Sequence, residues 1–162
     1  MIIKILLTIV SLFIILFLES FFTTLFSFSL LMLGLLILID KSNWKIWSIS
    51  ALIPTLLIDV LLHRPIGVTL LVVSLCVLVL YLLFLVIPKK EEIFSYVPYF
   101  FAVFLFYLLL TILTPLFQDG VWGVVNWKDI LGYVVKSLIT VGLLFLSNRL
   151  IENFRSGKDI LI

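Results

Sequence analysis

The sequence has little of what soluble proteins use most. Of its 162 residues only 12% are charged, whereas 64% are hydrophobic, and there is one cysteine and one histidine. Soluble domains average about a quarter charged residues, and a chain this short cannot bury so large an apolar surplus in a core of its own. The single cysteine, Cys76, excludes a disulfide framework and a cysteine-based metal site. Lipid must therefore be the solvent for most of the chain.

Motifs for catalysis and for nucleic-acid binding are also lacking. The sequence contains no glycine-rich phosphate loop, no H-E-x-x-H zinc motif and no G-x-S-x-G nucleophile motif. His63 has no second histidine to act with, and the net charge of +2 is too small to indicate a polyanionic partner. We therefore expect a protein that is not an enzyme, with no catalytic residue, metal site, cofactor or bound nucleic acid.

Long apolar runs predict the architecture instead. A membrane-spanning helix needs about 20 mostly apolar residues to cross a hydrocarbon core about 30 Å thick. Charged and turn-forming residues divide the chain into six such runs, which predict spans over residues 3–19, 21–39, 46–63, 66–87, 93–117 and 130–149. We expect an all-α polytopic membrane protein, a six-helix transmembrane bundle forming one integral membrane domain over residues 1–162.

The boundary between the first two spans is predicted from length. One helix over residues 5–39 would be about 50 Å long at 1.5 Å per residue, too long for the membrane without extreme tilt. The polar pair Glu19-Ser20 interrupts this run, and we predict a tight helical hairpin there. A five-span alternative, with the first two runs in one helix, is not excluded by the distribution of charge.

Lysine and arginine predict the orientation. With six spans, the N-terminus, the second and fourth loops and the tail share one side and carry eight of the eleven Lys and Arg residues. The opposite loops carry Arg64 and Lys128, and Lys136 lies within the last span, from which we expect its side chain to extend toward the nearby surface. Because cytoplasmic loops are rich in Lys and Arg, we expect both termini in the cytoplasm.

Asp59 is the first candidate for a functional residue. A carboxylate at membrane depth is costly, so it usually faces protein or water and has a partner. Glu19 and Arg64 are expected on the same side of the membrane and are candidate partners. Pro65 and Gly67 then stop one helix and make the turn into the next. Whether Asp59 hydrogen-bonds neighbouring backbone, contacts a partner protein or handles a ligand stays open at this point.

The segment from Leu57 to Gly67, LIDVLLHRPIG, resembles a signature of the MreD family of bacterial rod shape-determining membrane proteins. In that family an apolar helix ends in an Asp-Leu-Leu-like signature, followed by a short loop with Pro-x-Gly and another helix. The run through Tyr81 supplies that next helix here. Glu19-Ser20 stands where the family often has Gln-Ser, and the length of the chain also fits.

The resemblance implies a non-enzymatic membrane scaffold of the peptidoglycan elongation complex in the bacterial cytoplasmic (inner) membrane. Such a scaffold determines rod cell shape through association with MreC, a single-span protein with a coiled coil and an external β domain. Through MreC it would connect indirectly to actin-like MreB, to RodA and to a penicillin-binding protein, with membrane lipid around it. In this interpretation the site residues Asp59, Pro65, Gly67, Glu19 and Arg64 have structural or interface roles.

The family is also similar in fold to the substrate-binding S components of energy-coupling-factor vitamin transporters. An S component is therefore the alternative function, because one fold can carry both roles. S components often contact their coupling subunit through an Ala-x-x-x-Ala motif in the first helix. The only alanines here are Ala51 and Ala102, and neither lies in the first predicted span. This absence favours the scaffold.

Overall fold

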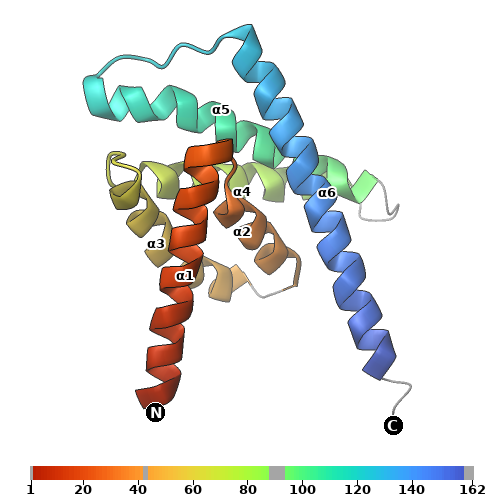
Figure 1. Ribbon diagram of the computed structural model, residues 1–162. Coiled ribbons are helices and arrows are strands. Elements are labelled where there is room, and N and C mark those ends of the chain that lie inside the picture. Colours follow the sequence, from red (N-terminus) through yellow and green to blue (C-terminus); the bar gives the residue numbers. More distant parts are fainter. Residues whose placement is uncertain (1, 42–43, 88–93, 159–162) are drawn as a thin grey trace.

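The computed structural model describes residues 2–41, 44–87 and 94–158 of the chain (Figure 1). These residues form helices and no strand, so the prediction of an all-α protein is confirmed for them. The elements are α1 (Ile2–Phe26), α2 (Leu30–Lys41), α3 (Trp44–Leu61), α4 (Val68–Val86), the short 3-10 helix η1 (Phe94–Tyr96), α5 (Val97–Asp119) and α6 (Trp127–Lys158).

Three of these helices are long and apolar enough to cross a membrane. They are α4, α5 and the part of α6 from Trp127 to Ile151, whereas the apolar stretches Phe13–Phe26 and Leu30–Ile39 are shorter. The 12 residues of α2 reach about 18 Å, well short of a hydrocarbon core of about 30 Å. The described part of the chain thus supports a membrane protein, with three such helices where six spans were predicted.

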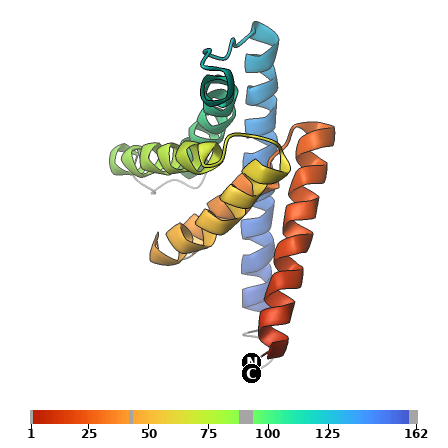
Figure 2. The ribbon, with the colours of Figure 1, turned by 90° about the vertical axis from the view of Figure 1, so that its left-hand side faces the viewer.

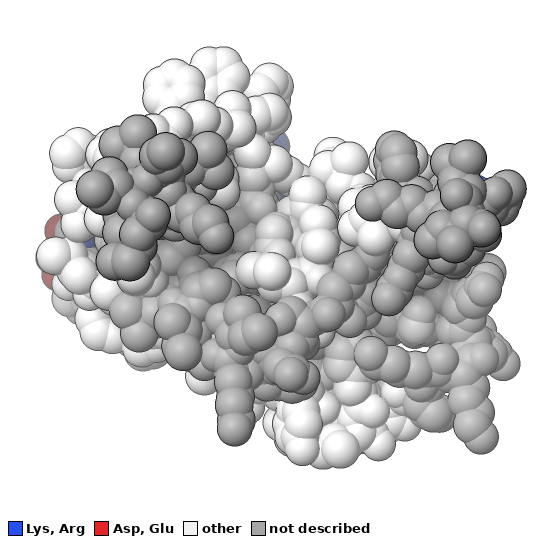
Figure 3. All heavy atoms as spheres, turned by 90° about the horizontal axis from the view of Figure 1, so that it is seen from below, with Lys and Arg blue, Asp and Glu red and all other residues white. Residues whose placement is uncertain are grey.

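The helices are not arranged as a simple parallel bundle. Helices α4 and α5 lie side by side and cross α1 and α6 steeply, as the two views in Figures 1 and 2 show. The first turn of α1 and the last turn of α6 lie at the same end of the molecule (Figure 1). Seen from that end, the described surface is almost entirely uncharged (Figure 3).

The core is centred on the contact between α4 and α5. Val72 and Cys76 of α4 and Ala102 of α5 are all fully buried, and Phe106 is 1% exposed. Ala102 contributes a small side chain to this core, and small residues are common where helices associate in lipid. Cys76 is a free thiol in this packing and acts as a small apolar side chain.

The predicted turn at Glu19-Ser20 is wrong. Helix α1 continues through both residues and ends at Phe26, and the chain turns at residues 27–29 before α2 begins. Ser27 ends the helix with a left-handed backbone, at φ 50°. The hairpin was predicted because one helix over residues 5–39 would be too long for the membrane and Glu19-Ser20 is the polar interruption in that run. Glu19 is instead buried, at 2% exposure, with its charge hydrogen-bonded inside the protein.

The connection between α5 and α6 folds back over α5. Pro115 has no backbone N–H, so the Thr111 carbonyl of α5 lacks its usual helical donor. Gly123 lies against this carbonyl and donates its own N–H to the Ile112 carbonyl at 3.2 Å. A Cβ at Gly123 would collide with the Thr111 carbonyl oxygen, so the close approach requires glycine. The loop also exposes Trp122, which suits an aromatic ring at the membrane interface.

Candidate functional site

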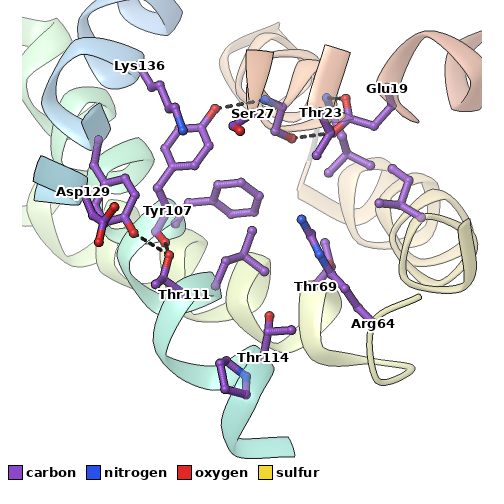
Figure 4. Close-up of a pocket in the computed structure, with 17 residues that line it drawn as sticks. Glu19, Thr23, Ser27, Arg64, Thr69, Tyr107, Thr111, Thr114, Asp129 and Lys136 are labelled. Carbon is purple, nitrogen blue, oxygen red and sulfur yellow. Dashed lines mark hydrogen bonds between the residues drawn. The ribbon is translucent and has the colours of Figure 1, made fainter. Parts of the chain in front are cut away.

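A polar cavity of about 530 Å³ lies where the α1–α2 turn, the α3–α4 loop, α5 and α6 meet (Figure 4). Apolar side chains such as Ile58, Phe106 and Leu110 form part of its wall. Its polar lining brings together residues that are far apart in the sequence: Glu19, Thr23, Ser27, Ser29, Arg64, Thr69, Tyr107, Thr111, Thr114, Asp129, Tyr133 and Lys136. This concentration of polar groups in a mostly apolar protein makes the cavity the candidate functional site.

Glu19 holds the start of α2. Its carboxylate accepts hydrogen bonds from the Ser29 hydroxyl and the Leu31 backbone N–H, both at 2.7 Å, and from the Thr23 hydroxyl at 3.3 Å. The Ser29 hydroxyl in turn accepts the Met32 N–H at 3.3 Å. A negative charge at the N-terminus of a helix is favourable because the first N–H groups lack partners and the helix dipole is positive there. Glu19 therefore joins α1 to α2.

Asp59 holds the start of α4, as Glu19 holds the start of α2. Its carboxylate accepts the Gly67 N–H at 2.8 Å and the Thr69 N–H at 3.2 Å, and Asp59 is fully buried. Gly67 has φ 94°, a backbone conformation that a residue with a Cβ adopts only under strain. Three roles were left open for Asp59, and the geometry shows the first of them: its carboxylate binds neighbouring backbone and joins α3 to α4.

The end of α3 explains the placement of His63 and Arg64. The Arg64 N–H donates to the Asp59 carbonyl at 2.8 Å and the His63 N–H to the Val60 carbonyl at 3.3 Å, which is a Schellman motif. His63 occupies the left-handed position of this motif, with φ 52°, and its side chain is exposed. After Pro65, whose carbonyl accepts the Val68 N–H at 3.2 Å, the chain enters α4.

Arg64 extends from this loop into the cavity (Figure 4). Burial lowers the pKa of its guanidinium, while the negative charges of Asp59 and Glu19 act in the opposite direction and raise it. An arginine side chain stays protonated in proteins, so Arg64 brings a positive charge into the cavity. The structure thus places Arg64 within the electrostatic reach of both carboxylates, which are themselves held by helix N-termini.

Lys136 also faces the cavity, and the expectation that it extends toward the membrane surface stays a prediction. Its ammonium nitrogen lies 5.2 Å from the ring centre of Tyr107 and 5.9 Å from that of Tyr133. The two rings stack with centres 6.2 Å apart, which gives the cation an aromatic surface to lie over. Tyr107 also accepts the Ser29 N–H at 3.0 Å, and the Tyr133 and Thr111 hydroxyls are 2.6 Å apart.

Asp129 completes the set of charges around the cavity. It lies in the first turn of α6, where its carboxylate accepts the Asn126 N–H at 3.0 Å. It is the third carboxylate at a helix N-terminus, after Glu19 at α2 and Asp59 at α4. Within the described residues, no group of three or more His, Cys, Asp or Glu side chains is placed to hold a metal ion.

Sequence reasoning selected Glu19 and Arg64 but missed the contribution of α5 and α6 to the site. A signal was available, because the polar residues of each helix recur at helical spacing. On α5 these are Tyr107, Thr111 and Thr114, and on α6 they are Tyr133, Lys136, Ser137 and Thr140. Each set forms one polar stripe in an apolar helix, and Tyr107, Thr111 and Thr114 of the first stripe and Tyr133 and Lys136 of the second line the cavity.

No family model matches this sequence, and no curated protein or solved structure is significantly similar to it. The resemblance to the MreD family therefore rests on the Leu57–Gly67 segment. The similarity of fold to transporter S components stays a prediction.

Proposed function

We propose that this protein is a non-enzymatic membrane scaffold of the bacterial peptidoglycan elongation complex, acting through a single-span partner similar to MreC. One observation carries the proposal. The residues on which the resemblance rests hold two helices together. Asp59 accepts the N–H groups of Gly67 and Thr69, and the backbone N–H of Arg64 donates to the Asp59 carbonyl at the end of α3. A signature that joins two helices and forms their turn suits a scaffold, because it presents a fixed surface to a partner.

The proposal includes a location. We place the protein in the bacterial cytoplasmic membrane with both termini in the cytoplasm, and with the cavity toward the outer side. The excess of Lys and Arg in the predicted cytoplasmic segments supports this orientation. The shared position of the start of α1 and the end of α6 agrees with termini on one side (Figure 1). The outer loops would then contact the membrane span and the external domain of the partner. That partner would connect the protein indirectly to MreB, RodA and a penicillin-binding protein.

A second function, that of an S component, is favoured by the cavity itself. A volume of about 530 Å³ falls within the range of about 300–1,000 Å³ that small-molecule sites usually have. In that case Arg64 and Lys136 would contact the substrate. The two functions predict different partners, since an S component binds a transmembrane coupling subunit that works with two ATPases.

Purification of the tagged protein in a mild detergent, followed by mass spectrometry of the proteins that accompany it, separates the two functions. The scaffold predicts a single-span coiled-coil protein together with cell-wall synthases. A coupling subunit with ATPases would overturn it in favour of the S component. As a matched pair, Asp59→Ala should reduce recovery of the partner, whereas Asp119→Ala, at an exposed position of α5, should not. Full recovery with both Asp59→Ala and Asp59→Asn would contradict an interface that depends on the α3–α4 turn.

A further inference from the structure

Two carboxylates and two cations line the cavity, and the carboxylates already have hydrogen-bond partners within the protein. Glu19 and Asp129 line it, and Asp59 is bound to the backbone N–H of Thr69 in its wall, but each carboxylate accepts at least one backbone N–H at the start of a helix. The partial positive charge of that helix end offsets the carboxylate locally. Each negative charge is therefore already hydrogen-bonded and partly offset within the protein.

Within the described part of the chain the two cations have no such hydrogen-bonded partners, and only attraction through space links Arg64 to Asp59 and Glu19 and links Lys136 to Asp129. Among the described residues, neither the Arg64 guanidinium nor the Lys136 ammonium takes part in a hydrogen bond or an ion pair. Lys136 lies over the faces of Tyr107 and Tyr133, which attract a cation but leave its N–H groups without acceptors. Figure 4 shows the two side chains entering the cavity from opposite sides, one from α6 and one from the α3–α4 loop.

Thr69 supplies an independent observation. It is 1% exposed and lines the same cavity, yet its hydroxyl oxygen has no hydrogen-bond partner. Buried hydroxyls without a partner are rare, because each carries the cost of its lost hydration. Its backbone N–H is already bound by Asp59, so the hydroxyl is the polar group of the Thr69 side chain that still lacks a hydrogen bond.

We propose that the cavity binds an anionic phosphate group, held between Arg64 and Lys136 with the Thr69 hydroxyl as a further donor. A phosphate has several acceptor oxygens and suits a guanidinium, an ammonium and a hydroxyl that converge from different directions. The volume exceeds that of a phosphate alone and leaves room for the rest of a lipid headgroup. The phosphate is either that of an anionic lipid or a free phosphate ion. This site is separate from the scaffold role and does not rest on it.

The test uses the full chain in a non-ionic detergent and measures binding by thermal shift and native mass spectrometry. The probes are a short-chain phosphatidic acid, a short-chain phosphatidylcholine and inorganic phosphate. We expect phosphatidic acid to bind more tightly than phosphatidylcholine. Binding of inorganic phosphate as well would identify the free anion as sufficient, and its failure to bind would identify the lipid headgroup, so either result supports the site. No preference for phosphatidic acid or phosphate over phosphatidylcholine would overturn it.

Two lysines of α6 provide a matched control. Lys136→Met should weaken phosphatidic acid binding about tenfold or more, the usual effect of losing a charge-assisted hydrogen bond. Lys128→Met removes an exposed lysine that does not line the cavity and should leave binding unchanged. Equal weakening by both would show attraction to the general surface and would overturn the site. If Lys136→Met does not fold, Thr69→Val replaces it as the test, because valine keeps the shape of the side chain. Weaker binding by Thr69→Val supports the proposal, and unchanged binding overturns it.

Discussion

The Asp59 carboxylate lies 2.8 Å from the backbone nitrogen of Gly67, and this bond joins the end of α3 to the start of α4. Glu19 makes the equivalent link from α1 to the Leu31 nitrogen of α2 at 2.7 Å. Two helix–turn–helix units of this protein are thus closed in the same way, with a buried carboxylate of the first helix bound to the first turn of the second. Such internal pairing is what allows an acidic residue to lie among apolar helices.

Asp59→Ala should destabilise the protein by about 1–3 kcal/mol, because two buried N–H groups of α4 lose their acceptor. Asp59→Asn should cost less, since the amide oxygen can still accept one of the two bonds. Thermal unfolding in detergent measures both. Asp119→Ala removes a carboxylate from an exposed position and serves as the control. If Asp59→Ala and Asp119→Ala unfold at the same temperature, the link between α3 and α4 does not contribute to stability.

Glu19 and Ser29 should be energetically coupled. The Ser29 hydroxyl donates to the Glu19 carboxylate and accepts from the Met32 N–H, so each residue fixes the other at the start of α2. Glu19→Gln and Ser29→Ala should each destabilise, and the double variant should lose less than the sum, with a coupling of about 0.5–3 kcal/mol. A double-mutant cycle by thermal or chemical unfolding measures it. Strict additivity would show that the contact carries no energy.

Gly123→Ala should destabilise by about 1–3 kcal/mol, because the added Cβ collides with the Thr111 carbonyl and must push the loop away from α5. Gly142→Ala offers a control in the interior of α6, where a Cβ meets nothing within 4 Å. This second change should stabilise the helix by about 0.5–1 kcal/mol, since alanine is the better helix former. Unfolding temperatures that move in the same direction for both variants would refute the close contact.

His63→Gly should stabilise the protein slightly, because His63 has φ 52° at the end of α3 and glycine adopts this conformation without steric cost. His63→Val should destabilise, since a β-branched side chain fits this region poorly. The same unfolding assay ranks the three proteins as Gly, His and then Val in falling stability. A more stable valine variant would be inconsistent with the Schellman motif.

The helical class and the membrane character followed from composition and apolar run length, which depend on sequence alone. The place of the first turn did not, because a polar pair in a long apolar run favours a break, and a carboxylate exposed to lipid would be costly. That cost disappears once the charge is hydrogen-bonded to residues ten or more positions away, such as Ser29 and Leu31. Tertiary contacts of this kind leave no local signal.

The cavity was only partly predictable for the same reason. Arg64 and Glu19 were expected on one side of the membrane, and the structure brings both to the cavity. The position of Lys136 near the start of its helix predicts only that its side chain extends toward the membrane surface. The stacked rings of Tyr107 and Tyr133 lie beneath its ammonium and come from two different helices, so no local pattern predicts this contact.

The proposed role in a bacterial elongation complex is tested most directly by depleting the protein from its source cell and measuring cell length and width. A scaffold of the elongation complex predicts that the length-to-width ratio falls toward one as the protein is lost. Expression of the wild-type chain should restore the ratio, and Asp59→Ala should restore it less well than Asp119→Ala. An unchanged ratio after complete depletion would contradict the proposed role in cell shape.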